Sequence, residues 1–222
     1  MEHYEDIFCH TESHTNIRGF LEHDFLLAAP RRDMQVVREV FNKLADRYEE
    51  PSRYYHTLSH LYLGLRIYFR LFKRVLEPTL LFPWYYHDSV YDSKASDNEQ
   101  RSGILWMRDA TALGFTPDEA EQGNAYILAT NPSAEPLSVI NDIDLAGLGA
   151  PPEVFDANTV QIRKEYHWVE PEVWRKGRLA ILNQILKRDR LYITQPFMDA
   201  FEAQARKNLK REIETLIKSE YY

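Results

Sequence analysis

The chain has 222 residues, of which 44% are hydrophobic and 27% charged, as in an ordinary globular protein with one sizeable domain. Its formal charge of −7, from 27 basic and 34 acidic residues, argues against binding to a nucleic-acid polymer, which usually needs clustered lysine and arginine. A single cysteine excludes an internal disulfide and a zinc site built from thiolates.

Targeting and membrane signals are not evident in the sequence. The N-terminal residues are acidic and lack the apolar stretch of a signal peptide. The most apolar short run, residues 80–86, is far too short to span a bilayer. We therefore expect a cytoplasmic protein with no membrane partner.

Helical periodicity dominates the first half of the chain, whereas the alternating patterns typical of strands are weak. Apolar residues at spacings of three and four predict helices over residues 34–48 and 57–76. Residues 79–91 are apolar nearly all round and predict a central helix. Residues 1–32 show weak periodicity, and we expect an N-terminal extension packed on or near a main domain of residues 33–222.

Capping signals delimit the helices of the second half. Asp97 is the expected N-cap of a helix that ends before Gly114. Thr116 and Pro117 mark the start of the next helix. We expect the remaining helices over residues 116–130, 152–168, 171–188 and 196–218. The predicted fold is all-α, a bundle of eight or nine helices.

Histidines and aspartates recur in three short segments with apolar neighbours. His56 and His60 are four residues apart and would share one face of a helix. His87 and Asp88 follow an apolar run, where a carboxylate is costly unless it is paired or binds a cation. Two aspartates within residues 142–144 lie among apolar residues in the same way. Imidazole and carboxylate ligands together suit a first-row transition ion with open positions for water and substrate.

The order of these segments resembles the HD-domain superfamily of metal-dependent phosphohydrolases. More specifically than the superfamily, the motifs resemble a bacterial family of predicted HD phosphohydrolases, over roughly residues 35–218. The motifs that carry this resemblance are residues 55–60, 87–92, 97–99, 127–130, 142–149 and 163–166. The resemblance implies an HD-domain-like helical bundle.

The resemblance also implies a metal site. Its ligands would be His60, His87, Asp88 and Asp144. Asp142 is the alternative for the last ligand. Many HD proteins have further histidines before the last aspartate that hold a second metal, but no histidine lies between positions 88 and 144 here. We therefore expect one divalent ion per site, drawn from Mn, Fe, Co, Ni, Zn and Mg.

Catalytic roles follow from the same resemblance. Water activated by the metal would attack a phosphoester or phosphoanhydride bond, and Asp88 or Asp144 would orient that water as well as bind the metal. His56 matches the histidine that protonates the leaving oxygen in cyclic-nucleotide phosphodiesterases. Arg163 either binds the substrate phosphate or lies solvated on a helix face. Glu99 is a candidate base, although a charge at a helix N-terminus is its simpler role.

The favoured function is hydrolysis of a small phosphorylated substrate, with a nucleotide as the first choice. Two alternatives remain at this stage: an HD-fold protein that senses a nucleotide without turnover, and a helical scaffold with no metal. The sequence leaves open the exact substrate and association into a homo-oligomer. Five histidines receive no catalytic role: His3, His10, His14, His23 and His167.

Overall fold

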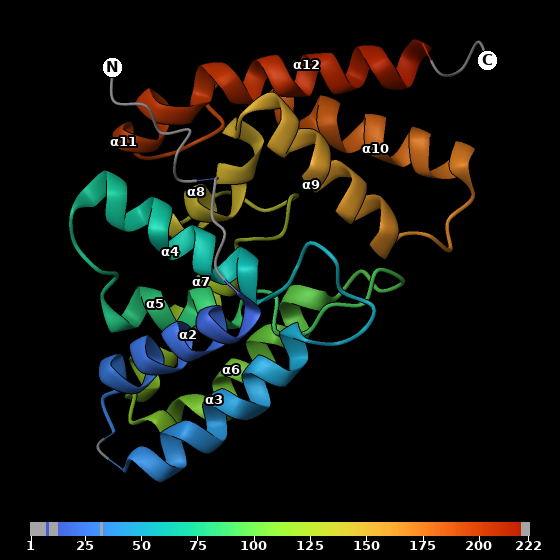
Figure 1. Ribbon diagram of the computed structural model, residues 1–222. Coiled ribbons are helices and arrows are strands. Elements are labelled where there is room, and N and C mark those ends of the chain that lie inside the picture. The colour runs from blue at the N-terminus through green and yellow to red at the C-terminus, as the bar shows by residue number, and fades with distance from the viewer. Residues whose placement is uncertain (1–7, 9–12, 32, 219–222) are drawn as a thin grey trace.

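The computed structural model describes residues 8, 13–31 and 33–218, and all regular secondary structure in these residues is helical (Figure 1). The prediction of an all-α chain is therefore confirmed for this part. Ten of the described α-helices have seven or more residues, slightly more than the eight or nine expected. They are α2 (His14–Ala28), α3 (Met34–Tyr48), α4 (Leu58–Phe72), α5 (Pro78–Tyr86), α6 (Asn98–Leu113), α7 (Pro117–Leu128), α8 (Val139–Leu145), α9 (Pro152–Glu165), α10 (Pro171–Leu186) and α12 (Ala203–Lys218). Shorter helical turns complete the set: a 3-10 turn (Ala146–Gly149), α11 (Gln195–Phe197) and a π turn (Met198–Glu202).

Local capping interactions explain where several helices begin and end. The Asp33 side chain accepts a hydrogen bond from the Val36 N–H at the start of α3. A capping box between Thr116 and Glu119 opens α7. Gly114 ends α6 with a φ of 94°, in the left-handed region that glycine adopts without cost. These boundaries agree with the predicted ones because they depend on neighbouring residues.

Two predicted helices end four or five residues earlier than expected. The helix expected over 79–91 ends at Tyr86, and the Arg53 guanidinium then bonds to the carbonyl oxygens of Asp88 and Ser89. Those carbonyl groups would otherwise accept bonds from a continuing helix. The helix expected over 57–76 ends where Lys73 adopts a φ of 54°.

The helical patterns do not predict α2 and α8. α2 packs on α3 and α4, and its Leu21 and Phe25 are fully buried in the main hydrophobic core. This segment of the expected N-terminal extension therefore contributes to the same core as the later helices. α8 has seven residues, which is too short for a 3.6-residue period to be recognised.

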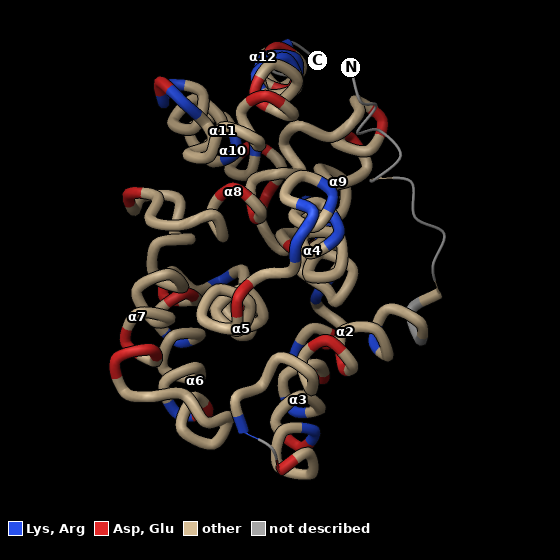
Figure 2. The backbone as a smooth tube through the Cα atoms, turned by 90° about the vertical axis from the view of Figure 1, so that its left-hand side faces the viewer, with Lys and Arg blue, Asp and Glu red and all other residues tan. Residues whose placement is uncertain are grey.

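The helices form two groups with the site-bearing helices between them. Figure 1 shows α9, α10 and α12 together at one end and α2, α3 and α6 at the other, with α4, α5 and α8 in between. α5 contains no charged residue and appears in Figure 2 as an uncharged tube through the middle. Among the described helices, none has the length and apolar character needed to cross a bilayer.

Gly64 allows the close packing of these central helices. A Cβ at this position would lie 2.3 Å from Trp84 Cζ2 and 2.6 Å from Ile143 Cγ2. These two residues belong to α5 and α8, so glycine is the residue that lets α4 approach both helices. The distances between the three segments that carry the predicted metal ligands depend on this contact.

We expect Gly64→Ala to lower the free energy of unfolding by about 1–3 kcal/mol, because the added methyl group has no space. Gly177→Ala in α10 is the matched control, since a Cβ there meets nothing within 4 Å. That change should raise the free energy of unfolding by about 0.5–1 kcal/mol through helix propensity. Urea unfolding followed by circular dichroism measures both, and equal effects would contradict the packing explanation.

Candidate metal centre

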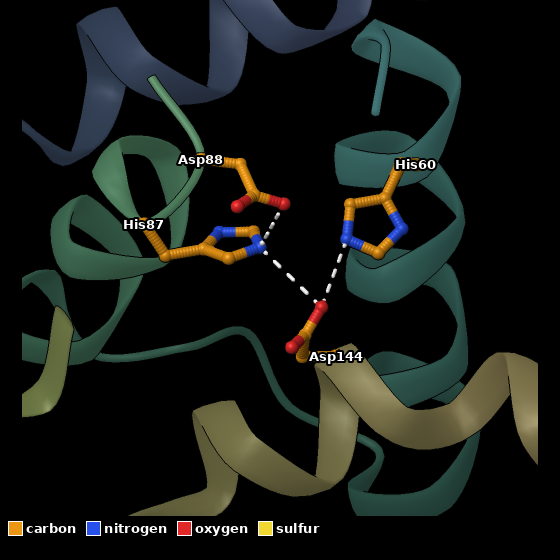
Figure 3. A group of neighbouring side chains, drawn as sticks. All are labelled: His60, His87, Asp88 and Asp144. Atoms are coloured by element: carbon orange, nitrogen blue, oxygen red, sulfur yellow. Dashed lines mark ion pairs between the residues drawn. The ribbon is translucent and has the colours of Figure 1, made fainter. Parts of the chain in front are cut away.

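Three segments far apart in the sequence bring four side chains to one point (Figure 3). His60 comes from α4, His87 and Asp88 from the turn after α5, and Asp144 from α8. One ligand atom from each residue lies within 4.8 Å of the corresponding atoms of the others. The two histidines are buried and the two carboxylates are partly exposed. The structure thus brings together all four residues predicted as ligands.

The two imidazole rings point nitrogen atoms at the carboxylates. His60 Nε2 lies 3.2 Å from Asp144 Oδ1, and His87 Nε2 lies 3.1 Å from Asp88 Oδ2 and 3.5 Å from Asp144 Oδ1. Neither Nε2 atom makes a hydrogen bond of acceptable geometry, although both are buried. Such atoms are costly when left unpaired. A cation between them and the carboxylates would satisfy all four groups.

The dimensions of the group fit a cation after a small contraction. Ligand atoms at ~2.1 Å on opposite sides of an ion are ~4.2 Å apart, and the ligand atoms here all lie within 4.8 Å of one another. Two imidazole nitrogens and two carboxylate oxygens suit a first-row divalent ion better than Ca²⁺. The residues therefore could hold a metal ion.

A backbone contact orients His87 for this role. Its Nδ1 atom lies 2.7 Å from the carbonyl oxygen of Trp84, and its ring stacks on the Trp84 ring with 4.4 Å between centroids. Only a protonated nitrogen can donate to a carbonyl, so the proton of the neutral ring belongs on Nδ1. The Nε2 lone pair is then directed at the carboxylates, the arrangement typical of metal-binding histidines.

Protonation of the group depends on the close approach of acids and histidines. Burial raises the pKa of Asp144, but His60 and His87 lower it more, to about 2. Burial likewise raises the pKa of Asp88, but this pKa lies well below its usual range because His87 and His56 lower it more. Burial lowers the pKa of His87, whereas Asp88 and Asp144 raise it well above its ordinary value. A metal ion must displace this proton, so its binding should weaken as the pH falls.

Asp142, the alternative last ligand, has other partners. Its Oδ1 atom accepts the Ile193 N–H at 2.7 Å, and its Oδ2 atom accepts the Thr194 N–H at 2.8 Å and hydroxyl at 2.6 Å. This buried carboxylate joins α8 to the segment that leads into α11. Asp144 is therefore the aspartate of α8 that faces the histidines.

His56 lies beside the group and is held by Glu165. Its Nε2 atom is 3.9 Å from Asp88 Oδ2, and its Nδ1 atom is 2.7 Å from Glu165 Oε2. The other carboxylate oxygen of Glu165 accepts the backbone N–H groups of Tyr54, Tyr55 and His56 at 2.8, 2.8 and 3.0 Å. Glu165 thus fixes both the segment before α4 and the orientation of the His56 ring.

The contact between His56 and Glu165 favours a protonated His56 ring beside an ionised Glu165 carboxylate. Burial lowers the pKa of His56, but Asp88 and Glu165 raise it above its ordinary value. Burial raises the pKa of Glu165, whereas His56 and the backbone N–H groups lower it to about 2. Sequence reasoning missed Glu165. The available signal was an acidic residue in the last turn of α9, where the helix dipole disfavours negative charge unless it has partners.

Arg163 and Glu99, the other predicted catalytic residues, have partners outside the group. The Arg163 guanidinium donates to the carbonyl oxygens of Tyr166 and Val169, at the C-terminal end of α9. Glu99 accepts a hydrogen bond from Asn131 Nδ2 at 3.2 Å. In the described part of the chain, no hydrogen bond or ion pair joins either residue to the four ligands. Their catalytic roles stay predictions.

Arg53 connects two segments of the site. Its side chain is fully buried, and its guanidinium donates to the carbonyl oxygens of His56, Asp88 and Ser89 at 3.2, 2.7 and 3.2 Å. One rigid group thus links the backbone of the His56 segment to that of the His87-Asp88 turn.

A small pocket of about 60 Å³ lies beside Asp144. The turn over residues 129–136 forms one wall, and Arg188 at the end of α10 forms another. Arg188 donates to the Pro132 carbonyl oxygen at 2.7 Å, and it has no carboxylate partner among the residues described. The pocket therefore places a guanidinium and a predicted metal ligand around the same space.

Of the histidines without a predicted role, His3 and His10 lie outside the described residues, as does Cys9. His23 and His167 are exposed, and the His167 Nδ1 atom lies 2.9 Å from the Lys164 carbonyl oxygen.

No model of a known protein family matches this chain, and no curated protein or solved structure matches it either. The resemblance of the motifs to HD phosphohydrolases therefore stays a prediction. The side chains of the site and their geometry are the basis for a functional assignment.

Proposed function

We propose that this protein is a metal-dependent phosphohydrolase with one divalent ion per chain. The ligands are His60, His87, Asp88 and Asp144. The observation that supports this most strongly is the pair of buried Nε2 atoms that lack hydrogen bonds and face two carboxylates. A divalent ion held there would supply Lewis-acid activation of water and of a phosphoryl oxygen, with open positions for both.

His56 is the residue placed to move a proton. It lies on the Asp88 side of the group, while Glu165 holds its Nδ1 atom. An imidazolium in this orientation can donate the proton on Nε2 to a leaving oxygen and keep its bond to Glu165. Asp88 and Asp144 stay ionised because their pKa values are lowered, so both carboxylates are available as ligands.

The pocket beside Asp144 supports an anionic substrate. Arg188 lines it without a carboxylate partner among the described residues, and a guanidinium binds two phosphoryl oxygens at once. The small volume favours a phosphoryl group in the pocket, with the remainder of the substrate outside. A small phosphorylated molecule fits these features, and nucleotides are the first class to test.

The test is a hydrolysis assay on protein stripped of metal and reloaded with Mn, Fe, Co, Ni, Zn or Mg. Nucleoside monophosphates and triphosphates, cyclic nucleotides and sugar phosphates are compared by chromatography of the products. We expect turnover of one substrate class with at least one metal, and its loss on chelation. Metal uptake and nucleotide binding without turnover would favour a nucleotide sensor instead. Failure to take up any metal would favour a helical scaffold.

A further inference from the structure

A second cavity, of about 440 Å³, lies between α2, the C-terminal half of α4 and the start of α5. It shares no lining residue with the metal centre. Its volume is within the range of small-molecule sites, about 300–1,000 Å³. Leu65, Leu76 and Leu81 provide apolar walls. The cavity is therefore large enough for a small ligand with an apolar part.

Large apolar side chains surround the mouth of this cavity. Phe20, Phe69 and Val75 line it and are 47%, 55% and 67% exposed. Single exposed apolar residues are common on proteins, but three around one concave site form a patch of the kind that marks ligand binding. Solvent exposure of this patch is unfavourable unless a ligand covers it.

Three cations line the same cavity: Arg66, Arg70 and Lys73. In the described part of the chain, none of them forms an ion pair with a carboxylate, although the chain carries a net charge of −7. Figure 2 looks onto this end of α4, where basic residues gather. Asp24 is the acidic residue of the lining, and its carboxylate accepts a hydrogen bond from the Tyr85 hydroxyl at 3.1 Å. The cavity therefore has positive charge available for an anion.

We propose that this cavity binds a small organic anion with an apolar body, such as a medium-chain carboxylate. The apolar body would lie against the three leucines, and the anionic group would meet the three cations at the mouth. A neutral apolar molecule would leave these cations without a partner, and a small inorganic anion would leave the apolar walls exposed. The concave shape suits one molecule better than a flat membrane surface.

Isothermal titration calorimetry on the full-length, metal-loaded protein tests this proposal. The probes are decanoate, decane-1-sulfonate, decan-1-ol and decyltrimethylammonium, each below its micellar concentration. Neither anion has a phosphoester bond, so a phosphohydrolase cannot consume them. We expect one molecule of either anion to bind per chain. The alcohol should bind at least about tenfold more weakly than the anions, and the cation should not bind.

Variants assign this binding to the cavity. Arg66→Gln combined with Arg70→Gln should weaken decanoate binding about tenfold. Val75→Glu should also weaken it, because it adds a carboxylate at the mouth. Ile104→Glu on α6 is the matched control, since Ile104 is 70% exposed and lies outside the cavity, and it should bind as the parent does. Metal content and the thermal unfolding midpoint verify that each variant is folded.

Three outcomes would overturn the proposal. The alcohol could bind as tightly as decanoate, or both cavity variants could retain the parental affinity while folded. The protein could also bind vesicles that contain phosphatidylserine and show no saturable affinity for free decanoate, which would indicate a membrane surface. Because metal content and hydrolysis are measured separately, failure here is distinct from failure of the proposed phosphohydrolase activity.

Discussion

Asp144→Asn should reduce the bound metal from about one ion per chain to less than about a tenth of that, and hydrolysis should be lost with it. The Asp144 Oδ1 atom lies within 3.2 Å of His60 Nε2 and 3.5 Å of His87 Nε2, so the substitution removes a negative ligand from the centre of the group. Asparagine has nearly the same shape, so the fold should survive. Mass spectrometry of metal content after gel filtration gives the stoichiometry.

Asp142→Asn is the matched control, two positions away on the same short helix. Its carboxylate accepts bonds from Ile193 and Thr194 and does not face the histidines. We expect this variant to retain its metal but to unfold about 1–3 kcal/mol more easily, because one carboxylate oxygen that accepts hydrogen bonds is replaced by an amide NH₂ that cannot accept them. Loss of metal from Asp142→Asn, or full retention by Asp144→Asn, would contradict the ligand set.

Thermal unfolding gives an independent readout of the same difference. Metal at a hundred times its dissociation constant should stabilise the native state by about 2.7 kcal/mol. For a chain of this length, that corresponds to a rise of about 5–10 °C in the unfolding midpoint. Asp144→Asn should lose this metal-dependent rise. Asp142→Asn should keep it, starting from a lower midpoint.

The four residues of the group could be predicted from sequence because each is an ionisable residue in an apolar segment and because their order resembles that of HD phosphohydrolases. His87 and Asp88 follow six consecutive buried residues of α5, where burial of charge demands a partner. The same reasoning could not separate Asp142 from Asp144, since both lie among apolar neighbours. Their difference depends on which side of α8 faces α4 and which faces residues 193–194, and this is a property of the tertiary structure.

Glu165 could not be predicted from sequence in this way, because its partners are distant in sequence. Its carboxylate binds residues 54–56, more than a hundred positions earlier. Arg163 is two positions away and is the better phosphate ligand by charge alone. In the structure, however, its guanidinium binds the carbonyl groups at the end of α9. The resemblance identified the segment, but the fold determines which side chain of the segment faces the site.

The fold shows the same difference between features that the local sequence indicates and features that tertiary packing decides. Helices with capping residues were predicted with nearly correct ends, whereas the helix expected over 57–76 ends at Phe72 and the one expected over 196–218 is divided by the π turn. α2 was missed because Leu26 and Leu27 follow Phe25 directly, and Leu27 is 65% exposed while the other two are buried. Three consecutive apolar residues give no preferred face. Burial in α2 is decided by its packing on α3 and α4.

Glu165→Gln should leave the metal in place and lower kcat by about 10²–10⁴-fold, the usual contribution of a positioned general acid. Glutamine can still accept the N–H groups of residues 54–56 through its oxygen. Its NH₂ group would face His56 Nδ1, which can then no longer carry a proton. The positioned imidazolium is lost, and the proton for the leaving oxygen is lost with it.

The pH dependence of kcat for Glu165→Gln follows from the direction in which Glu165 shifts the pKa of His56. Activity that needs protonated His56 is present below the pKa of His56 and is lost as the pH rises through it. Removal of the Glu165 charge lowers the pKa of His56, so the alkaline limb of the kcat profile should move to lower pH. A metal bound to Asp88 would weaken the effect of that carboxylate on the pKa of His56, which leaves Glu165 as its main partner.

The free energy of unfolding should change in the acidic pH range in which Glu165 becomes protonated. The pKa of Glu165 is about 2, below its ordinary value of 4.5, so its contribution is fully present above about pH 4.5 and is lost as the pH falls toward 2. The pKa of His56 is raised above 6.5, so its contribution is present below that pH and is lost as the pH rises through the raised pKa. Urea unfolding at about pH 3 and about pH 5.5 should therefore differ more for the parent than for Glu165→Gln.

Glu172→Gln is the control that separates a pKa shift from a function. The pKa of Glu172 is also lowered to about 2, by Arg175 and Lys176, but this residue lies on the surface and far along the chain from the ligands. Solvent screens such pairs, so the substitution should change neither kcat nor the alkaline limb. If Glu165→Gln kept the parental kcat and pH profile while folded and metal-loaded, His56 would not be the proton donor, and Glu165 would only hold the backbone before α4.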